Sequence, residues 1–187
     1  AVDSALTTAN SGDASDDIVT LKAGISYQFS PNWQAYLNTG QGFHSNDARG
    51  ATTVADPVTL ETVEPVDLLV KSDGAELGLR FFDYTAFNAS LAVWYLQLDS
   101  ELLYVGDAGT NEANRGSKRY GVELAAYYWI GSNWSLDAEL ALTRSRFTGT
   151  EVGEGNYVDG SLPLVASMGL IYKADRPWQA SLRLRHF

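Results

Sequence analysis

Long stretches of this chain alternate strictly between apolar and polar residues. After Trp134 the even positions are apolar from Leu136 to Leu142, while Ser135, Asp137 and Glu139 lie between them. The same alternation runs through residues 179–185 after Trp178. Successive side chains of a β-strand point to opposite faces of the sheet. The pattern therefore predicts strands with one apolar face and one polar face.

Each of four tight turns is followed by an aromatic residue. The turns are residues 30–32, 83–86, 131–133 and 175–177, and the rings that follow them are Trp33, Phe87, Trp134 and Trp178. A transmembrane β-strand needs about ten residues of alternation, with apolar side chains toward lipid and an aromatic ring at the interface. The repeat therefore predicts an outer-membrane β-barrel or a piece of one, in which these four rings form an interfacial girdle.

The fold class predicted is all-β: an antiparallel, up-and-down transmembrane β-barrel segment with eight strands in four hairpins. Their expected ranges are 18–29, 33–43, 75–82, 87–98, 118–130, 134–146, 164–173 and 178–187. Residues 101–105 are expected to extend a hairpin beyond the membrane.

The facing of the strand at 87–98 stays open. One apolar phase consists of Ala89, Leu91, Val93 and Tyr95, and the other of Trp94, Leu96 and Leu98. A β-bulge or a crowded patch facing the lumen would explain this.

The predicted connections alternate between short turns and long loops. This asymmetry is typical of outer-membrane barrels, whose short turns are periplasmic. A soluble β-sandwich also has many strands and turns, but it does not need an aromatic residue after every tight turn. The longest apolar run, residues 124–130, is too short for a transmembrane helix, and no helix is evident from the pattern.

Acidic residues concentrate outside the predicted strands. Segments 1–17, 44–73, 99–118 and 147–162 hold 17 of the 23 acidic and 4 of the 13 basic side chains, in a chain of net charge −10. Such loops are commonly a solvated face. No basic stripe is evident in the sequence to neutralise the phosphates of a nucleic acid, so we do not expect nucleic-acid binding.

The candidate chemistry favours binding over catalysis. The two histidines, His44 and His186, lie in opposite parts of the chain, and the Gly-x-Ser-x-Gly elbow of serine hydrolases is absent. We predict no catalytic residues, no metal ligands and no cofactor. Calcium binding by loop aspartates such as Asp13 and Asp16 stays open, although turn chemistry explains these residues without a metal.

Several motifs, in the same order, resemble the barrel of a TonB-dependent receptor. They are GFHSNDARG at 42–50, GAELGLR at 74–80, WYLQLDSEL at 94–102, VGDAGT at 105–110 and RYGVE at 119–123. The resemblance implies that residues 1–187 are a partial domain, about eight strands of a 22-stranded barrel in the outer membrane of a Gram-negative bacterium. In this family the stretch like residues 181–187 is followed by further strands, so we expect Phe187 to be a truncation point.

The resemblance also implies a function and partners. Such receptors import a scarce bulky nutrient, such as a ferric siderophore or another metal chelate, using a plug domain and the TonB complex. Neither the plug nor a TonB-contacting segment is evident here, and outer-membrane lipid is the remaining expected partner. Substrate capture would use residues flanking the long loops. The candidates are Phe43, His44, Asp47, Arg49, Asp107, Glu112 and Arg115.

An alternative is a self-contained eight-stranded outer-membrane barrel with a structural or adhesive role. It requires that the first and last strands pair with each other. The small and polar residues expected on the lumen face, among them Gly24, Gly78 and Gly121, suit the wall of a wide lumen better than a packed small core.

Overall fold

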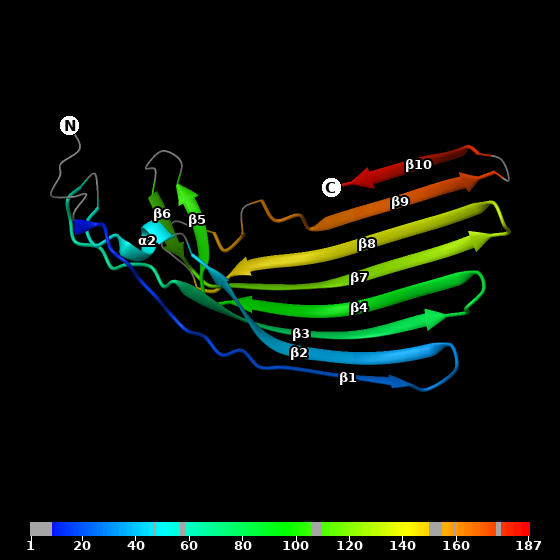
Figure 1. Ribbon diagram of the computed structural model, residues 1–187, viewed down its shortest axis with the longest axis horizontal. Helices are drawn as coiled ribbons and strands as arrows, with labels where there is room; N and C mark the ends of the chain where they lie inside the picture. Colours follow the sequence, from blue (N-terminus) through cyan, green and yellow to red (C-terminus); the bar gives the residue numbers. More distant parts are fainter. Residues whose placement is uncertain are drawn as a thin grey trace.

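The protein is an open, bowed β-sheet with its long loops gathered at one end (Figure 1). The computed structural model describes residues 9–46, 48–56, 59–105, 110–149, 155–158, 160–174 and 177–187. Eight antiparallel strands pair in the order β1-β2-β3-β4-β7-β8-β9-β10. Their bounds are β1 Lys22–Gln28, β2 Trp33–Ser45, β3 Leu69–Phe82, β4 Phe87–Leu98, β7 Ser117–Ile130, β8 Trp134–Phe147, β9 Leu164–Lys173 and β10 Gln179–His186.

The up-and-down order confirms the predicted fold class. Strands β4 and β9 have the predicted bounds, while β3 begins at Leu69, six residues earlier than expected. This early part of β3 pairs with the end of β2, from Ser45↔Leu69 to Gly40↔Gly74. The pairing extends both strands beyond the region of clear alternation.

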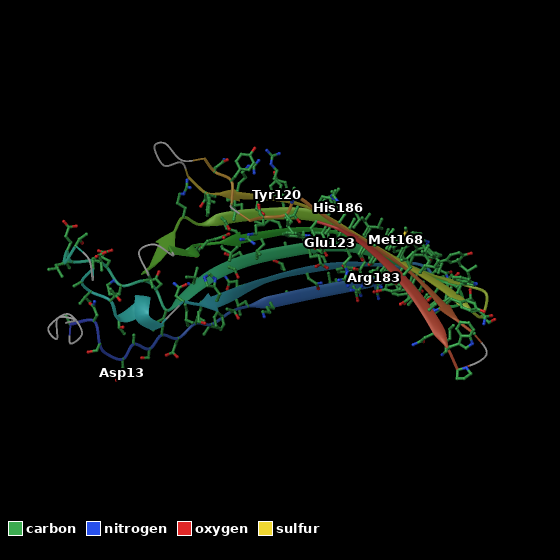
Figure 2. All side chains as sticks on the ribbon, turned by 90° about the horizontal axis from the view of Figure 1, so that it is seen from above. Asp13, Tyr120, Glu123, Met168, Arg183 and His186 are labelled. Atoms are coloured by element: carbon green, nitrogen blue, oxygen red, sulfur yellow. The ribbon has the colours of Figure 1, made fainter. Side chains whose placement is uncertain are left out.

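Strands β1 and β10 form the two edges of the sheet and do not pair with each other. The sheet is therefore not closed, in contrast to the closed barrel that the eight-stranded alternative requires. Figure 2 shows the bow of the sheet, with Tyr120 toward its convex side and Glu123 toward its concave side.

Alternation and register together define the two faces. On the convex face, one row of paired residues crosses six strands and is wholly apolar: Ile25, Leu37, Leu77, Val93, Val122 and Leu142. On the concave face, the adjacent row contains Gly24, Asn38, Glu76, Trp94, Gly121 and Thr143. The predicted separation into an apolar and a polar side is thus a property of the whole sheet.

The register also decides the facing of β4. Val93 pairs with Val122 and Tyr95 pairs with Tyr120, which places both on the convex face. Trp94 consequently lies on the concave face, opposite Gly121. The pairing of β4 with its neighbours runs without interruption from Ser72↔Leu98 to Phe82↔Asn88, so no bulge is needed. The structure instead agrees with the second explanation, a crowded patch on the polar face.

The short turns are joined to their neighbours by asparagine side chains. Asn32 Nδ2 donates to the carbonyl of Phe82 at 2.6 Å, and Asn133 Nδ2 donates to that of Lys173 at 2.7 Å. In return, the N–H groups of Phe82 and Lys173 donate to the carbonyls of Asn32 and Asn133. In two turns the asparagine that precedes the tryptophan thus links one hairpin to the neighbouring strand. These hydrogen bonds hold adjacent turns at the same edge of the sheet.

The turn at 83–86 is organised by one carboxylate. The backbone N–H groups of Thr85, Ala86 and Phe87 donate to Asp83 Oδ1 at 2.7, 2.7 and 2.9 Å. These hydrogen bonds favour the ionised carboxylate and lower the pKa of Asp83 to about 2. The bonds from Phe87 and Thr85 contribute most.

We expect the replacement Asp83→Asn to remove a pH-dependent part of the stability. A lowered pKa in the folded state stabilises the protein above the unfolded pKa of 3.8, and this contribution is lost as the pH falls toward 2. Urea unfolding in detergent micelles should show the variant less stable than the wild type near pH 6, with the difference shrinking between pH 4 and pH 2. A difference that stays constant over this range would contradict the assignment.

The opposite end of the sheet carries the loops. A second sheet, formed by β5 (Glu101–Val105) and β6 (Thr110–Asn114), confirms the expected hairpin extension and adds a strand in a region predicted to be turns. Contrary to the prediction of no helix, α2 spans Ala48–Thr52. Asn10 ties the N-terminal segment to this loop, since its Oδ1 accepts from the N–H groups of Val54 and Ala55 at 3.0 Å.

Among the described residues, the helices are all too short or too polar to traverse a bilayer.

Candidate functional site

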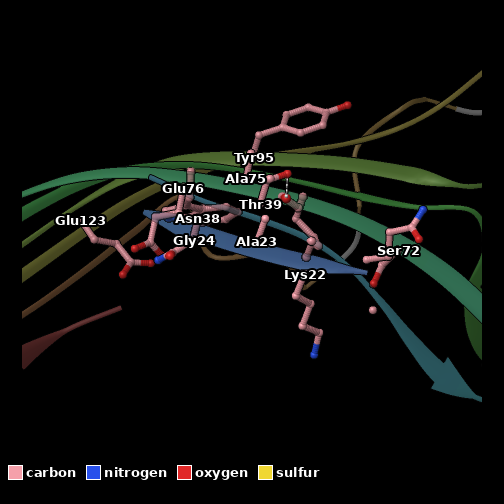
Figure 3. A pocket seen from close by; sticks show the side chains of 16 residues that line it. Lys22, Ala23, Gly24, Asn38, Thr39, Ser72, Ala75, Glu76, Tyr95 and Glu123 are labelled. Carbon is pink, nitrogen blue, oxygen red and sulfur yellow. Dashed lines mark hydrogen bonds between the residues drawn. The ribbon is translucent and has the colours of Figure 1, made fainter. Parts of the chain in front are cut away.

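The concave face holds an open hollow of about 710 Å³. Its lining comes from β1, β2, β3, β4 and β7 and includes Lys22, Asn38, Glu76, Trp94 and Glu123. Figure 3 shows Lys22, Glu76 and Glu123 on one side of the sheet and Tyr95 on the other. Most of the lining, including Lys22, Glu76 and Glu123, belongs to the polar wall, while Ala23, Ala75 and Tyr95 contribute from positions of the convex phase.

Glycine residues leave space at this wall that larger side chains would otherwise fill. Gly24, Gly40, Gly42 and Gly74 all line the hollow. At Gly121 the indole of Trp94 packs across the strand, so that a Cβ there would lie 2.8 Å from the Trp94 ring and 2.6 Å from the carbonyl oxygen of Leu142. The glycine is thus required by the close approach of a ring and a neighbouring backbone.

Carboxylates form a stripe across the wall. Glu76 of β3 and Glu123 of β7 border the main hollow and also a second one of about 420 Å³, to which Glu139 of β8 contributes. On this face the ion pairs found among the described side chains are Arg119–Glu101 at 2.6 Å and Arg183–Asp137 at 2.9 Å. None of the three stripe glutamates therefore has a basic partner within that part of the chain.

The base of the β5–β6 hairpin is fixed to the wall by Glu101. Arg119 donates to Glu101 Oε1 through Nε at 3.2 Å and through Nη2 at 2.6 Å. The fully buried Ser117 hydroxyl donates to the same oxygen. Since Ser117 and Arg119 share one side of β7, this carboxylate joins the hairpin to the top of the concave face.

Arg115 connects two long loops. Its guanidinium lies 4.7 Å from the centre of the Phe147 ring and donates to the carbonyls of Gly149 and Gly155 at 3.5 and 3.2 Å. Thr148 adds a bond from its Oγ1 to the carbonyl of Gly116 at 2.8 Å. Thr148, Gly149 and Gly155 are thereby held against the connection between β6 and β7.

The described residues that were predicted to bind a ligand come from several elements. His44 lies on the concave side near the end of β2, whereas Phe43 shares the convex side with Leu37. Arg49 is in α2 and Glu112 is in β6, opposite Leu103. Asp47 and Asp107 lie outside the described residues. The structure thus brings Arg115 into loop contacts and places α2, which contains Arg49, next to β6, which contains Glu112.

The predicted girdle residues follow the rim at the short-turn end. Rings contact one another in a chain from Phe29 to Trp33, Phe81, Phe87 and Tyr128, with centroid separations of 4.8 to 6.5 Å. Trp134 packs on Tyr172 at 4.6 Å, and Trp178 is largely exposed beside β10. The partners of the predicted rings come from strand ends, where alternation alone does not reveal which rings meet.

The arrangement offers no assembled acid–base chemistry in the described part of the chain. His44 in β2 and His186 in β10 are separated by five intervening strands. No group of three or more His, Cys, Asp or Glu side chains in that part is placed to hold a metal ion.

An open antiparallel sheet, apolar on its convex face and polar on its concave face, is the wall of a membrane-type β-barrel. The family model for the TonB dependent receptor-like β-barrel matches residues 2–187. The chain therefore belongs to this receptor family, which confirms the resemblance seen in the sequence.

Solved structures of similar fold include two proteins named as metal transporters and one named as a ferric yersiniabactin uptake receptor. The copper transporter OprC superposes with a TM-score of 0.66 at 19% identity, covering 88% of this chain and 25% of its own. The ferric yersiniabactin uptake receptor FyuA from Yersinia pestis superposes with a TM-score of 0.60 at 23% sequence identity. This match covers 89% of the present chain and 24% of FyuA. The FrpB iron transporter from Neisseria meningitidis superposes with a TM-score of 0.63 at 16% sequence identity. This match covers 88% of the present chain and 25% of FrpB.

The chain thus spans about a quarter of the length of these proteins. A sequence comparison with curated proteins gave no match.

Proposed function

We propose that this chain is part of the barrel wall of an outer-membrane importer that takes up a ferric siderophore or another metal chelate. The observation that carries the proposal is the open eight-stranded sheet of the TonB-dependent receptor family, with a wide polar wall of small residues. The names of the similar structures, which refer to copper, to ferric yersiniabactin and to iron, support a metal chelate as the cargo.

In this proposal the convex face contacts lipid and the concave face lines the lumen. The girdle residues Trp33, Phe87, Trp134 and Trp178 then lie at the periplasmic interface, and the loop end faces the outside. The stripe of Glu76, Glu123 and Glu139 faces a plug domain, whose basic side chains would supply the partners that the wall lacks. The TonB complex would act on that plug.

Uptake by the whole receptor tests the proposal. A strain lacking the receptor is supplied with ferric catecholate, ferric hydroxamate, copper(II) or cobalamin, each radiolabelled. Restoring the receptor is expected to restore accumulation of one metal chelate, and deleting TonB should abolish it. Accumulation that does not depend on the receptor for any of the four would overturn a role in import of this kind.

Arg115 is expected to affect substrate affinity through the loops. Replacing it with alanine removes its contact with the Phe147 ring and its hydrogen bonds to Gly149 and Gly155, so the binding surface at the loop end loses its fixed shape. We expect the Kd of the whole receptor for its chelate to rise roughly three- to tenfold, as for the loss of one or two charge-assisted hydrogen bonds on a partly exposed side chain. Tryptophan fluorescence quenching measures this change.

The matched control is Arg185→Ala, which removes the same charge from β10 on the concave wall, away from these loops. Equal losses of affinity in both variants would contradict a specific role of Arg115.

A further inference from the structure

Basic side chains form a compact block on the convex face at the loop end. Lys118 of β7 pairs directly opposite Arg146 of β8, and Tyr120 pairs opposite Arg144. Residues two apart on a strand share a face, so all four lie on the same side as Val122 and Leu142. Like charges directly opposite one another destabilise a sheet. The repulsion between Lys118 and Arg146 therefore destabilises the sheet unless an anion binds to these side chains.

The block begins where the apolar band of the convex face ends. From Trp134 upward, the convex side chains of β8 are Leu136, Ala138, Leu140 and Leu142, followed by Arg144 and Arg146. Ten residues separate Trp134 from Arg144, which is roughly 33 Å along the strand. At a strand tilt of about 40° this is roughly 25 Å across the bilayer, the height of the apolar band of such barrels. The guanidinium of Arg144 thus reaches the level of the lipid headgroups at the loop end.

The charges of this block are not neutralised within the described part of the protein. Neither Lys118 nor Arg144 has a carboxylate within 4.0 Å there, and both are exposed. The row of Lys118 runs through Gln97 of β4 to Asp73 of β3, whose Oδ1 accepts from Gln41 Nε2 at 3.3 Å. Ion pairing among the described residues therefore does not account for the block.

One member of the block is held in place. The guanidinium of Arg146 stacks on the Tyr157 ring at 3.5 Å, and its Nη1 donates to the carbonyl of Ser145 at 3.0 Å. A backbone bridge between Arg146 and Tyr157 fixes the ring as well. An arginine oriented in this way loses little freedom when it binds a phosphate.

We propose that Lys118, Arg144 and Arg146 form a binding site for the phosphate groups of an anionic lipid of the outer leaflet. Guanidinium groups bind phosphate through paired, charge-assisted hydrogen bonds, and the lysine adds a point charge. Tyr95 and Tyr120, paired side by side on the same face, supply rings at the level where acyl chains meet headgroups. The site rests on the proposed membrane orientation but not on the identity of the imported chelate.

Native mass spectrometry of the whole receptor in detergent tests the proposal. The probes are diphosphoryl lipid A, monophosphoryl lipid A and phosphatidylcholine, each titrated separately. The variant is Lys118→Gln combined with Arg144→Gln, and the control is Arg185→Gln on the concave face. We expect diphosphoryl lipid A to bind tightest to the wild type and to the control, and at least tenfold more weakly to the double variant.

Two results would overturn the site. One is equal affinity of the wild-type receptor for all three lipids, a measurement that needs no variant and therefore does not depend on how well the variant folds. The other is an equal loss of lipid A binding in the double variant and in Arg185→Gln. Because chelate uptake is not measured, failure of the lipid site and failure of the import function are distinguished.

Discussion

Replacing Arg119 with methionine is expected to lower the free energy of unfolding by about 2–3 kcal/mol. The change leaves Glu101, whose side chain is 12% exposed, without its cationic partner. Removing one member of a buried ion pair costs about 3–5 kcal/mol, and we reduce this value because the arginine itself is 34% exposed. Methionine keeps much of the length of the side chain, so the loss reports the charge and its hydrogen bonds. Urea unfolding in detergent micelles measures it.

A double-mutant cycle separates the ion pair from other contributions. Glu101→Gln alone also breaks the pair, but it leaves a neutral side chain that still accepts from the Ser117 hydroxyl. Adding Arg119→Met to this variant should then cost less than 1 kcal/mol, since the interaction is already lost. If the two losses simply add, the pair does not hold the base of the β5–β6 hairpin.

Gly121→Ala is expected to lower the free energy of unfolding by about 1–3 kcal/mol, the range for forcing an extra methyl group into a packed site. The new Cβ would lie 2.6 Å from the backbone oxygen of Leu142 and 2.8 Å from the Trp94 ring. The backbone oxygen belongs to the paired strand β8 and cannot move away without disturbing the ladder. Urea unfolding in detergent micelles, followed by tryptophan fluorescence, measures the difference.

Gly24→Ala is the matched control on the same face. Its nearest obstacle is the side-chain oxygen of Asn38 at 2.6 Å, while the nearest backbone atom is 3.8 Å away. An asparagine side chain can rotate, so we expect a change below about 1 kcal/mol in either direction. An equal loss in both variants would show that the loss reflects glycine in a strand generally and not the packing of Trp94.

The long strands and short turns could be predicted because their signals are local. A turn such as 131–133 ends one alternating run and begins another, and Gly131 adopts the left-handed backbone that favours glycine there. The loop end was predicted less well. The helix α2 and the strand β6 are each five residues long, too short for a periodic pattern to stand out.

The candidate site was predicted only in part for a similar reason. Arg119 and Glu123 follow from strand alternation as residues of the polar face, but their different roles do not. Arg119 reaches Glu101, eighteen positions away in the sequence, whereas Glu123 borders the hollow beside Glu76, which belongs to another hairpin. Such pairings depend on register between strands, which alternation within one strand does not contain.

The sequence by itself determined the fold class, the four hairpins and which residues of most strands share a face, because side-chain direction in a strand follows from position alone. The tertiary structure decided the facing of β4, the crossing of Trp94 over Gly121 and the meeting of Lys118, Arg144 and Arg146. Each of these requires knowing which residues of two strands lie opposite one another. That register is set by the energy of the whole ladder, where a shift of one residue would turn every apolar side chain of a strand to the polar face.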